Sequence, residues 1–91
     1  MKYLVLSTLR LGISVTATVK KAITTHYDHI KELKSVGKLE VHYPLLGRQG
    51  GMSIYDVESH EELQRLLVQN PLFNFNEYKI YPLLEYESVK K

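Results

Sequence analysis

The stretch Gly47–Leu67, GRQGGMSIYDVESHEELQRLL, decides the fold, because it holds a turn, a strand and a helix start in succession. The glycines permit a tight turn, and Met52–Val57 has the composition of a strand. Ser59, with Glu62 three residues later, predicts a capping box, in which side chains satisfy free amides at the helix start. A strand therefore leads directly into a short helix.

The segment KLEVHYPLL before the turn, residues 38–46, alternates between apolar and polar positions and is predicted to be the partner strand of a hairpin. The alternation predicts one face formed by Leu39, Val41, Tyr43 and Leu45 and another formed by Glu40, His42 and Pro44. A proline in the strand suits an edge position or a bulge.

Two elements are predicted before this hairpin. Lys2–Leu9 is a continuous apolar run of strand length. From about residue 18 to residue 36 the apolar positions recur with the period of a helix. Ser14 or Thr16 can cap its start, and Gly37 supplies a left-handed stop at its end.

The second helix is predicted to end at Asn70–Pro71, and Glu77–Tyr86 is the last predicted strand. The order β-α-β-β-α-β predicts an α+β protein of the ferredoxin-like type. Its four antiparallel strands carry both helices on one face. We expect a single domain spanning residues 1–91.

Composition narrows the class of protein. The 91 residues are 44% hydrophobic and 24% charged, as in an ordinary globular protein. The absence of cysteine excludes disulfides and thiolate metal sites, and it fits a cytoplasmic location. A net charge of +2, spread along the chain, argues against nucleic-acid binding. No apolar run reaches the ~18–20 residues of a membrane span, and the start MKYLVLSTLRLGIS is interpreted as a strand rather than a signal peptide.

The sheet face without helices is expected to be apolar. Large side chains occupy both alternating sets of the later strands, for example Met52 and Ile54 against Tyr55 and Val57. An exposed patch of this kind marks an interaction surface. We therefore expect a homodimer in which a second sheet covers this face, or a larger homo-oligomer.

Several short motifs resemble the muconolactone isomerase family. They are SIYDVES followed by EEL, then Leu67, PLF and the closing YPL, without gaps. A weaker likeness extends back through KELKSVGK to the first helix. The resemblance implies dimeric α+β barrels that assemble further, up to a decamer. It also implies cofactor-free proton transfer within an unsaturated five-membered lactone, in aromatic catabolism.

The family's catalytic residues do not carry over. The resemblance implies a glutamate base on the first helix, with a tyrosine and an asparagine in the corner before SIYDVES. The matching positions here are His26, Gln49 and Gly51. The scaffold therefore matches, whereas the isomerase site does not.

His26 is the leading candidate for a catalytic residue. It lies within the apolar stripe of the first helix, so it is either a hydrogen-bonded core residue or the polar group of a cavity. An imidazole, with a reference pKa near ~6.5, can replace a carboxylate as a base near neutral pH. In the catalytic interpretation, we expect it to project into a chamber between two paired sheets.

Three further residues are candidates for binding a small molecule. Arg48 and Gln49 can contact a ligand carboxylate, and Tyr43 can line a pocket. The alternative is that the first two are solvated turn residues and that Tyr43 packs at a sheet surface. His26, His29 and His42 are considered as metal ligands, but their predicted faces argue against a metal site. No cofactor is predicted.

Two functions remain open. One is a small isomerase of lactones or related enolisable acids, with His26 as the base. The other is a non-catalytic protein that binds a small molecule or serves assembly on the same barrel. RNA binding needs exposed aromatic residues in a basic strand, and SIYDVE is acidic.

Overall fold

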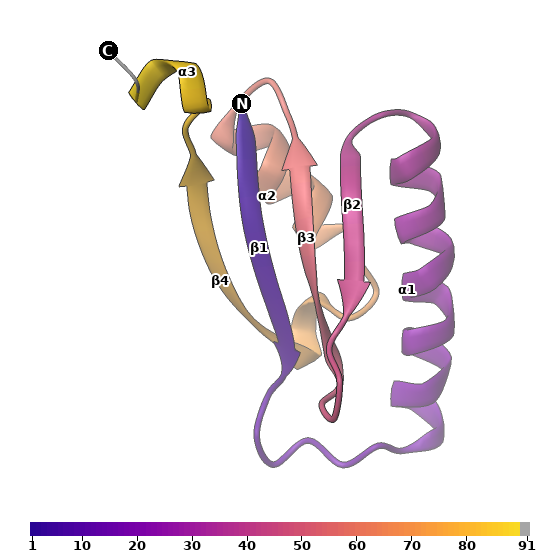
Figure 1. The fold of residues 1–91 in the computed structure, drawn as a ribbon. Helices are drawn as coiled ribbons and strands as arrows, with labels where there is room; N and C mark the ends of the chain where they lie inside the picture. The colour runs from indigo at the N-terminus through magenta and orange to yellow at the C-terminus, as the bar shows by residue number, and fades with distance from the viewer. Residues whose placement is uncertain (90–91) are drawn as a thin grey trace.

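Four strands form one antiparallel sheet in the order β2-β3-β1-β4. The computed structural model describes residues 1–89. Its elements are β1 (Lys2–Leu9), α1 (Ala17–Ser35), β2 (Leu39–Pro44), β3 (Gly50–Asp56), α2 (His60–Val68), the 3₁₀ turn η1 (Phe73–Phe75), β4 (Asn76–Leu83) and α3 (Tyr86–Val89). The predicted ferredoxin-like order is confirmed, and Figure 1 shows α2 behind β1 and β3, with α1 alongside β2.

The core lies between the sheet and the helices. Its buried members come from β1, α1, the start of β2, β3 with the residue that follows it, and α2: Tyr3, Val5, Ile30, Leu33, Leu39, Tyr55, Val57, Leu63, Leu66 and Leu67. Alternate residues of β1 and β3 point into it, as the period of a strand requires. No helix of residues 1–89 covers the other face of the sheet (Figure 1).

The ends of α1 follow the sequence signals. The backbone amide of Val19 donates to the Thr16 hydroxyl at 3.3 Å, so Thr16 rather than Ser14 is the N-cap. Gly37 has a φ of 78°, a left-handed conformation that ends the helix without the strain of a side chain.

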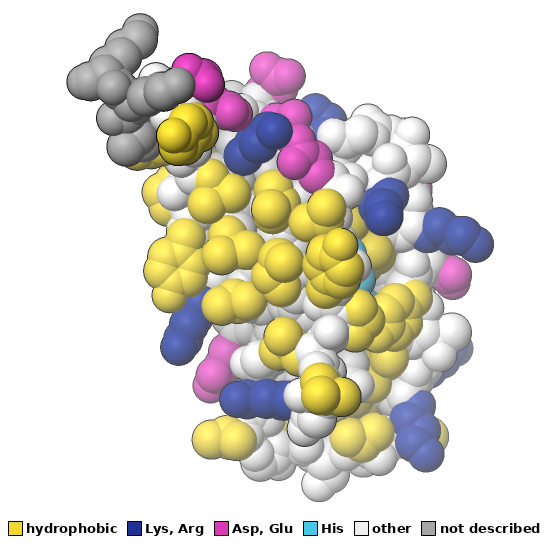
Figure 2. Space-filling model, in the orientation of Figure 1, with side chains coloured by type: hydrophobic (Ala, Val, Ile, Leu, Met, Phe, Trp, Pro, Cys, Tyr) yellow, Lys and Arg dark blue, Asp and Glu magenta, His cyan; other side chains and the backbone are white. Residues whose placement is uncertain are grey.

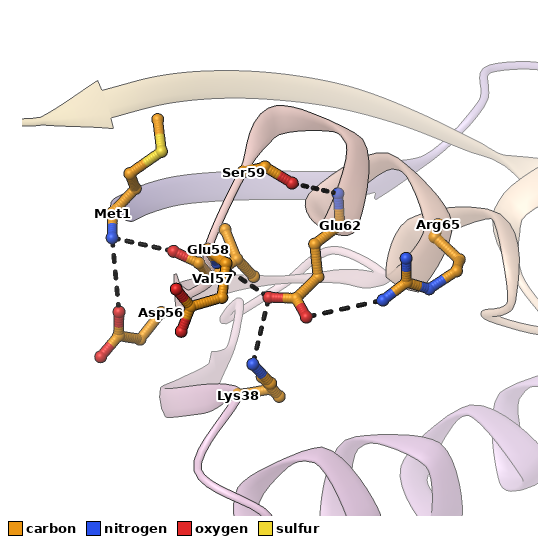
Figure 3. Close-up of polar contacts among 8 residues, drawn as sticks. All are labelled: Met1, Lys38, Asp56, Val57, Glu58, Ser59, Glu62 and Arg65. Carbon is orange, nitrogen blue, oxygen red and sulfur yellow. Dashed lines mark hydrogen bonds and ion pairs between the residues drawn. The ribbon is translucent and has the colours of Figure 1, made fainter.

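The start of α2 is held by a network of polar contacts around Glu62 (Figure 3). The Glu62 amide donates to the Ser59 hydroxyl at 3.1 Å. The Glu62 carboxylate accepts from the amide of Glu58 at 2.9 Å, one residue before the position that a capping box usually uses, and from Lys38 at 3.1 Å. The hydrogen bond from the Glu58 amide lowers the pKa of the Glu62 carboxyl most, and the hydrogen bond from Lys38 lowers it further. The predicted helix start is therefore confirmed, with a shifted partner for the carboxylate.

Several predicted boundaries differ from the structure, and β2 covers only Leu39–Pro44 rather than residues 38–46. β3 begins at Gly50, two residues earlier than predicted, because Gly50 and Gly51 pair with β1. The last strand ends at Leu83 rather than at Tyr86. Leu83 pairs with Lys2, the first residue of β1, so the chain beyond it has no neighbouring strand to pair with. The short helix α3 follows.

A bulge in β2 changes the predicted faces of this strand. Leu39 pairs with Tyr55 and Val41 with Ile54, so Glu40 is an extra residue on β2. The predicted grouping of Leu39 with Val41, Tyr43 and Leu45 is therefore wrong. Leu39 lies on the helix side, whereas Val41 and Tyr43 lie on the open side, and Leu45 follows the end of the strand.

The open face of the sheet is apolar, as predicted. The pairing places the following side chains on it: Leu4, Leu6, Val41, Tyr43, Met52, Ile54, Tyr81 and Leu83. Figure 2 shows them as a broad hydrophobic area over the strands, with charged side chains around its margin. Among the described residues, no helix is long and apolar enough to cross a membrane.

Candidate functional site

His26 lies on the inner face of α1 and is only 7% exposed. Its Nδ1 lies 3.1 Å from Oδ1 and 2.8 Å from Nδ2 of Asn70, which follows α2 and is also buried. The Asn70 Oδ1 accepts the amide proton of Leu72 at 2.9 Å, which fixes the orientation of this side-chain amide. Asn70 can therefore accept from Nδ1–H of His26, or donate to Nδ1 when that nitrogen is unprotonated.

His42 shares this environment. Its ring centroid lies 5.8 Å from that of His26, and the exposed ring of Tyr27 lies 5.1 Å from His26 and 6.3 Å from His42. The His42 ring also contacts Ser53, because its Nδ1 lies 2.7 Å from the hydroxyl of this buried residue. The prediction that His42 points away from the His26 side was wrong. The bulge at Glu40 turns it towards the helices.

His29, the third histidine considered for a metal site, points elsewhere. Its Nε2 lies 3.3 Å from the carbonyl oxygen of Leu66 in α2, to which Nε2–H can donate. Within residues 1–89, no group of three or more histidine, cysteine or acidic side chains is arranged to hold a metal ion. The site is therefore described by the pair His26 and His42.

Both histidines of the pair favour the uncharged form. Burial lowers the pKa of His26, and Asn70 opposes this shift in part. Burial also lowers the pKa of His42, and the nearby His26 and Lys34 add to the shift because each disfavours a second positive charge. Near neutral pH both rings are therefore neutral and each keeps one nitrogen lone pair.

The sheet separates His26 from the open face. His26 contacts Asn70, which follows α2, and His42 on the helix side of β2. The expectation that His26 projects into a chamber between two paired sheets is therefore wrong. His26 therefore lies on the helix side of the sheet, beside the edge strand β2.

The other candidate residues lie on the opposite side of the sheet or in the turn. Tyr43 is 62% exposed on the open face. Arg48 lines a hollow of about 270 Å³, together with Leu6, Thr8, Leu45, Glu77 and Lys79. Gln49 lies in the turn, and its backbone carbonyl accepts from the amide of Leu9 at 3.0 Å. The structure therefore does not bring Arg48 and Tyr43 together with His26.

Three residues of the His26 environment were not identified as site residues from the sequence. Asn70 was interpreted only as the end of a helix, and Ser53 as an ordinary strand residue. Gly51 is named from the sequence only as part of the turn and as the position that matches the family's asparagine, although it lies in β3 and has no positive φ. A glycine inside a strand signals a close approach by another group, and this was the available clue.

Comparisons with known proteins agree on one family. Residues 1–89 match the family of muconolactone delta-isomerase. The muconolactone delta-isomerase of Rhodococcus opacus is 36% identical over 71 residues, which cover 78% of this chain and 76% of that protein. That of Cupriavidus pinatubonensis is 35% identical over 60 residues, which cover 66% of this chain and 65% of that protein.

Solved structures share the fold. A crystal structure of muconolactone isomerase superposes with a TM-score of 0.85 at 24% identity, covering 97% of this chain and 93% of the other. The 5-chloro-2-hydroxyhydroquinone dehydrochlorinase of Burkholderia phenoliruptrix, in complex with 2,5-dihydroxybenzoquinone, gives a TM-score of 0.76 at 18% identity and covers 97% of this chain and 98% of the other. The sequence match over nearly the whole chain and the shared fold lead to one conclusion: this chain belongs to the muconolactone delta-isomerase family.

Proposed function

We propose that this protein transfers a proton within a small lactone or a related enolisable acid, without a cofactor, and that His26 is the general base. The observation that carries the proposal is the buried imidazole of His26, held at Nδ1 by Asn70, in a chain of the muconolactone delta-isomerase family. Isomerisation of this kind needs a base that removes a proton from carbon and a donor that stabilises the enolate oxygen.

The surroundings of His26 support the role of a base. When Nδ1–H donates to the Asn70 Oδ1, the lone pair resides on Nε2, which can then accept a proton. The lowered pKa keeps the ring neutral near pH 7. When Nε2 becomes protonated, Nδ1–H keeps its acceptor, so Asn70 acts as a positioning residue for both states of the ring.

Exchange of carbon-bound protons tests this proposal. The wild-type protein is incubated with muconolactone in D₂O, and ¹H NMR follows both isomerisation and deuterium incorporation. We expect His26→Ala to lower kcat by about 10²–10⁴-fold, the usual contribution of general base catalysis. His60→Gln, which removes an imidazole at the start of α2, is the matched control and keeps the wild-type rate. An unchanged rate for His26→Ala excludes His26 as the base.

A second function has an observation in its favour. The positions that the family resemblance assigns to its tyrosine and asparagine are Gln49 and Gly51 here, which favours a protein that binds a small molecule without converting it. A thermal-shift screen of lactones and aromatic acids separates the two functions. A ligand that raises the melting temperature but incorporates no deuterium supports the binding protein.

We also propose that a second copy of the chain covers the open face of the sheet. This face carries the apolar side chains of all four strands, a larger continuous apolar surface than single exposed residues provide. Ile54→Lys, at its centre, is expected to convert a dimer or larger oligomer into monomers in light scattering. Val68→Lys, which replaces an exposed apolar residue of α2, is the control and leaves the oligomer intact.

Arg48 and Tyr43 are not part of the site proposed around His26, since neither is brought to it, and Gln49 contributes its backbone carbonyl to the contact with Leu9. Arg48 and Tyr43 stay candidates for a ligand on the open face. Replacing Arg48 with Ala separates the two regions. The variant is expected to keep the isomerase rate if the reaction takes place at His26.

A further inference from the structure

His42 is brought to His26 by a local irregularity. The extra residue Glu40 shifts the register of β2, so that His42 pairs with Ser53 and both side chains lie on the helix side. The rings of His26 and His42 then meet edge to face, with centroids 5.8 Å apart and an interplanar angle of 69°. Without the bulge, His42 would lie on the open face.

The space that the His42 ring occupies is created by Gly51. A Cβ atom on Gly51 would lie 2.6 Å from Cε1 and 3.2 Å from Nε2 of His42. Gly51 has no positive φ, so the backbone does not require glycine at this position. The missing side chain therefore leaves room for the ring of His42, and the Cε1–Nε2 edge of that ring lies against Gly51.

We propose that His42 is the hydrogen-bond donor to the enolate oxygen in the reaction proposed above, acting through Nε2–H while the Ser53 hydroxyl holds Nδ1. This inference rests on the proposed function, and it adds a catalytic residue to the same site. Ser53 suits the task, because its hydroxyl is buried 2.7 Å from Nδ1 and can donate to it. When the hydroxyl donates to Nδ1, the single proton of the neutral ring lies on Nε2.

The charges around the pair agree with this division of roles. The groups that face His42 are His26, Tyr27 and Lys34 from α1 and Ser53 from β3. The groups that face His26, besides His42, are Asn70 and His29, which lies on the same helix. Burial, together with His26 and Lys34, lowers the pKa of His42, so it stays neutral while His26 gains the proton. A neutral imidazole is the form that donates a hydrogen bond without releasing a full proton.

Protons and electrons balance over one turnover of the proposed reaction. His26 Nε2 takes a proton from the ring carbon next to the ring oxygen, which is conjugated with the lactone carbonyl through the C=C bond. The electron pair of the broken C–H bond moves through the conjugated system onto the carbonyl oxygen, which accepts the hydrogen bond from His42 Nε2–H. The electron pair then returns to form a C–H bond at the carbon next to the carbonyl group, and His26 supplies the proton. Both histidines end in their starting states.

The test compares three variants with the wild type. His42→Leu removes the donor, and we expect kcat to fall by about 10²–10³-fold, the usual effect of losing one such donor, while KM changes little. His42→Gln keeps an N–H group at a similar reach and is expected to recover part of kcat. Ser53→Ala leaves the ring in place without its Nδ1 partner, so a smaller loss is expected. Circular dichroism checks that each variant is folded.

The outcomes separate this inference from the proposed function. If the wild type converts muconolactone and His42→Leu keeps its kcat, the role of His42 is refuted while His26 can still be the base. If the wild type converts no lactone, the proposed function fails, and the role of His42 fails with it. If lactone is converted, ¹⁵N NMR of the imidazoles adds a second readout. A His42 ring with its proton on Nε2 supports the inference, and a ring with its proton on Nδ1 overturns it.

Discussion

Replacing Gly51 with alanine is expected to expel the His42 ring from its present place. The new Cβ would lie 2.6 Å from Cε1, whereas carbon atoms in contact are normally about 3.5–4.0 Å apart. The ring therefore has to move by about 1 Å or more. Such a movement breaks the 2.7 Å contact with Ser53 and leaves that buried hydroxyl without its partner.

The expected cost follows from these contacts. An unpaired buried hydroxyl destabilises a protein by about 1–3 kcal/mol, and a crowded core position adds a similar amount. Part of the crowding is relieved, because His42 is half-buried on the edge strand β2 and can swing towards solvent. We therefore expect Gly51→Ala to lower the free energy of unfolding by about 1–2 kcal/mol.

A double-mutant cycle measures whether His42 is the cause. Urea denaturation at about pH 8, where both histidines are neutral, compares the wild type, Gly51→Ala, His42→Ala and the double variant. In the His42→Ala background the new methyl group no longer meets the ring, so a coupling energy of about 1–2 kcal/mol is expected. Additive effects within about 0.5 kcal/mol would refute the reasoning.

Gly50→Ala is the matched control for this cycle. A Cβ on Gly50 would lie 2.2 Å from the backbone carbonyl oxygen of Ser7 and 3.0 Å from Cα of Thr8. Its clash is with the backbone of β1, on the other face of β3 from His42. Gly50→Ala is therefore expected to destabilise the protein by the same amount with and without His42→Ala.

Three further measurements follow from the contacts. Ser59→Ala removes the side-chain acceptor of the Glu62 amide and is expected to cost about 1 kcal/mol in urea denaturation. The pKa values of His26 and His42 are lowered in the folded protein, so the unfolded chain binds protons more readily as the pH falls below 6.5. The melting temperature should therefore fall with pH below 6.5. Replacing both histidines with Gln should make the melting temperature less dependent on pH in this range. The buried Tyr78 hydroxyl makes no hydrogen bond of standard geometry among the described residues, although the Asn76 side chain lies near enough to oppose the rise in its pKa that burial causes. Tyr78→Phe should therefore not destabilise the protein, and a clear loss of stability would show that Asn76 is a true partner.

The sequence predicted the fold because its local signals agree with one another. Thr16 and Ser59 cap the two helices, Gly37 ends the first, and each strand has a length and composition typical of a sheet. The predicted last strand is too long, because the apolar composition continues beyond Leu83. The pairing of Leu83 with Lys2 sets the end of this strand. That limit depends on a residue at the far end of the chain, which no local pattern contains.

The candidate site was predicted only in part. His26 was identified because its place on the apolar stripe of α1 follows from the helical period alone. Asn70 was not identified from the sequence, because its contact with His26 joins residues 44 positions apart and no local pattern contains both. Arg48 and Tyr43 were grouped with His26 on residue type, whereas the sheet lies between them.

The bulge at Glu40 links the two surfaces on which the proposed reaction and the proposed assembly depend. A regular β2 in register with Leu39 would turn Val41 and Tyr43 towards the helices and His42 towards the apolar open face. On that face the imidazole of His42 would lose its contact with the Ser53 hydroxyl. An unpaired polar group in an apolar interface lowers stability. With the bulge, two apolar side chains join the open face while His42 pairs with Ser53 beside His26. One inserted residue therefore favours both the apolar surface for assembly and the histidine pair, and the hydrophobic pattern of β2 cannot be interpreted without it.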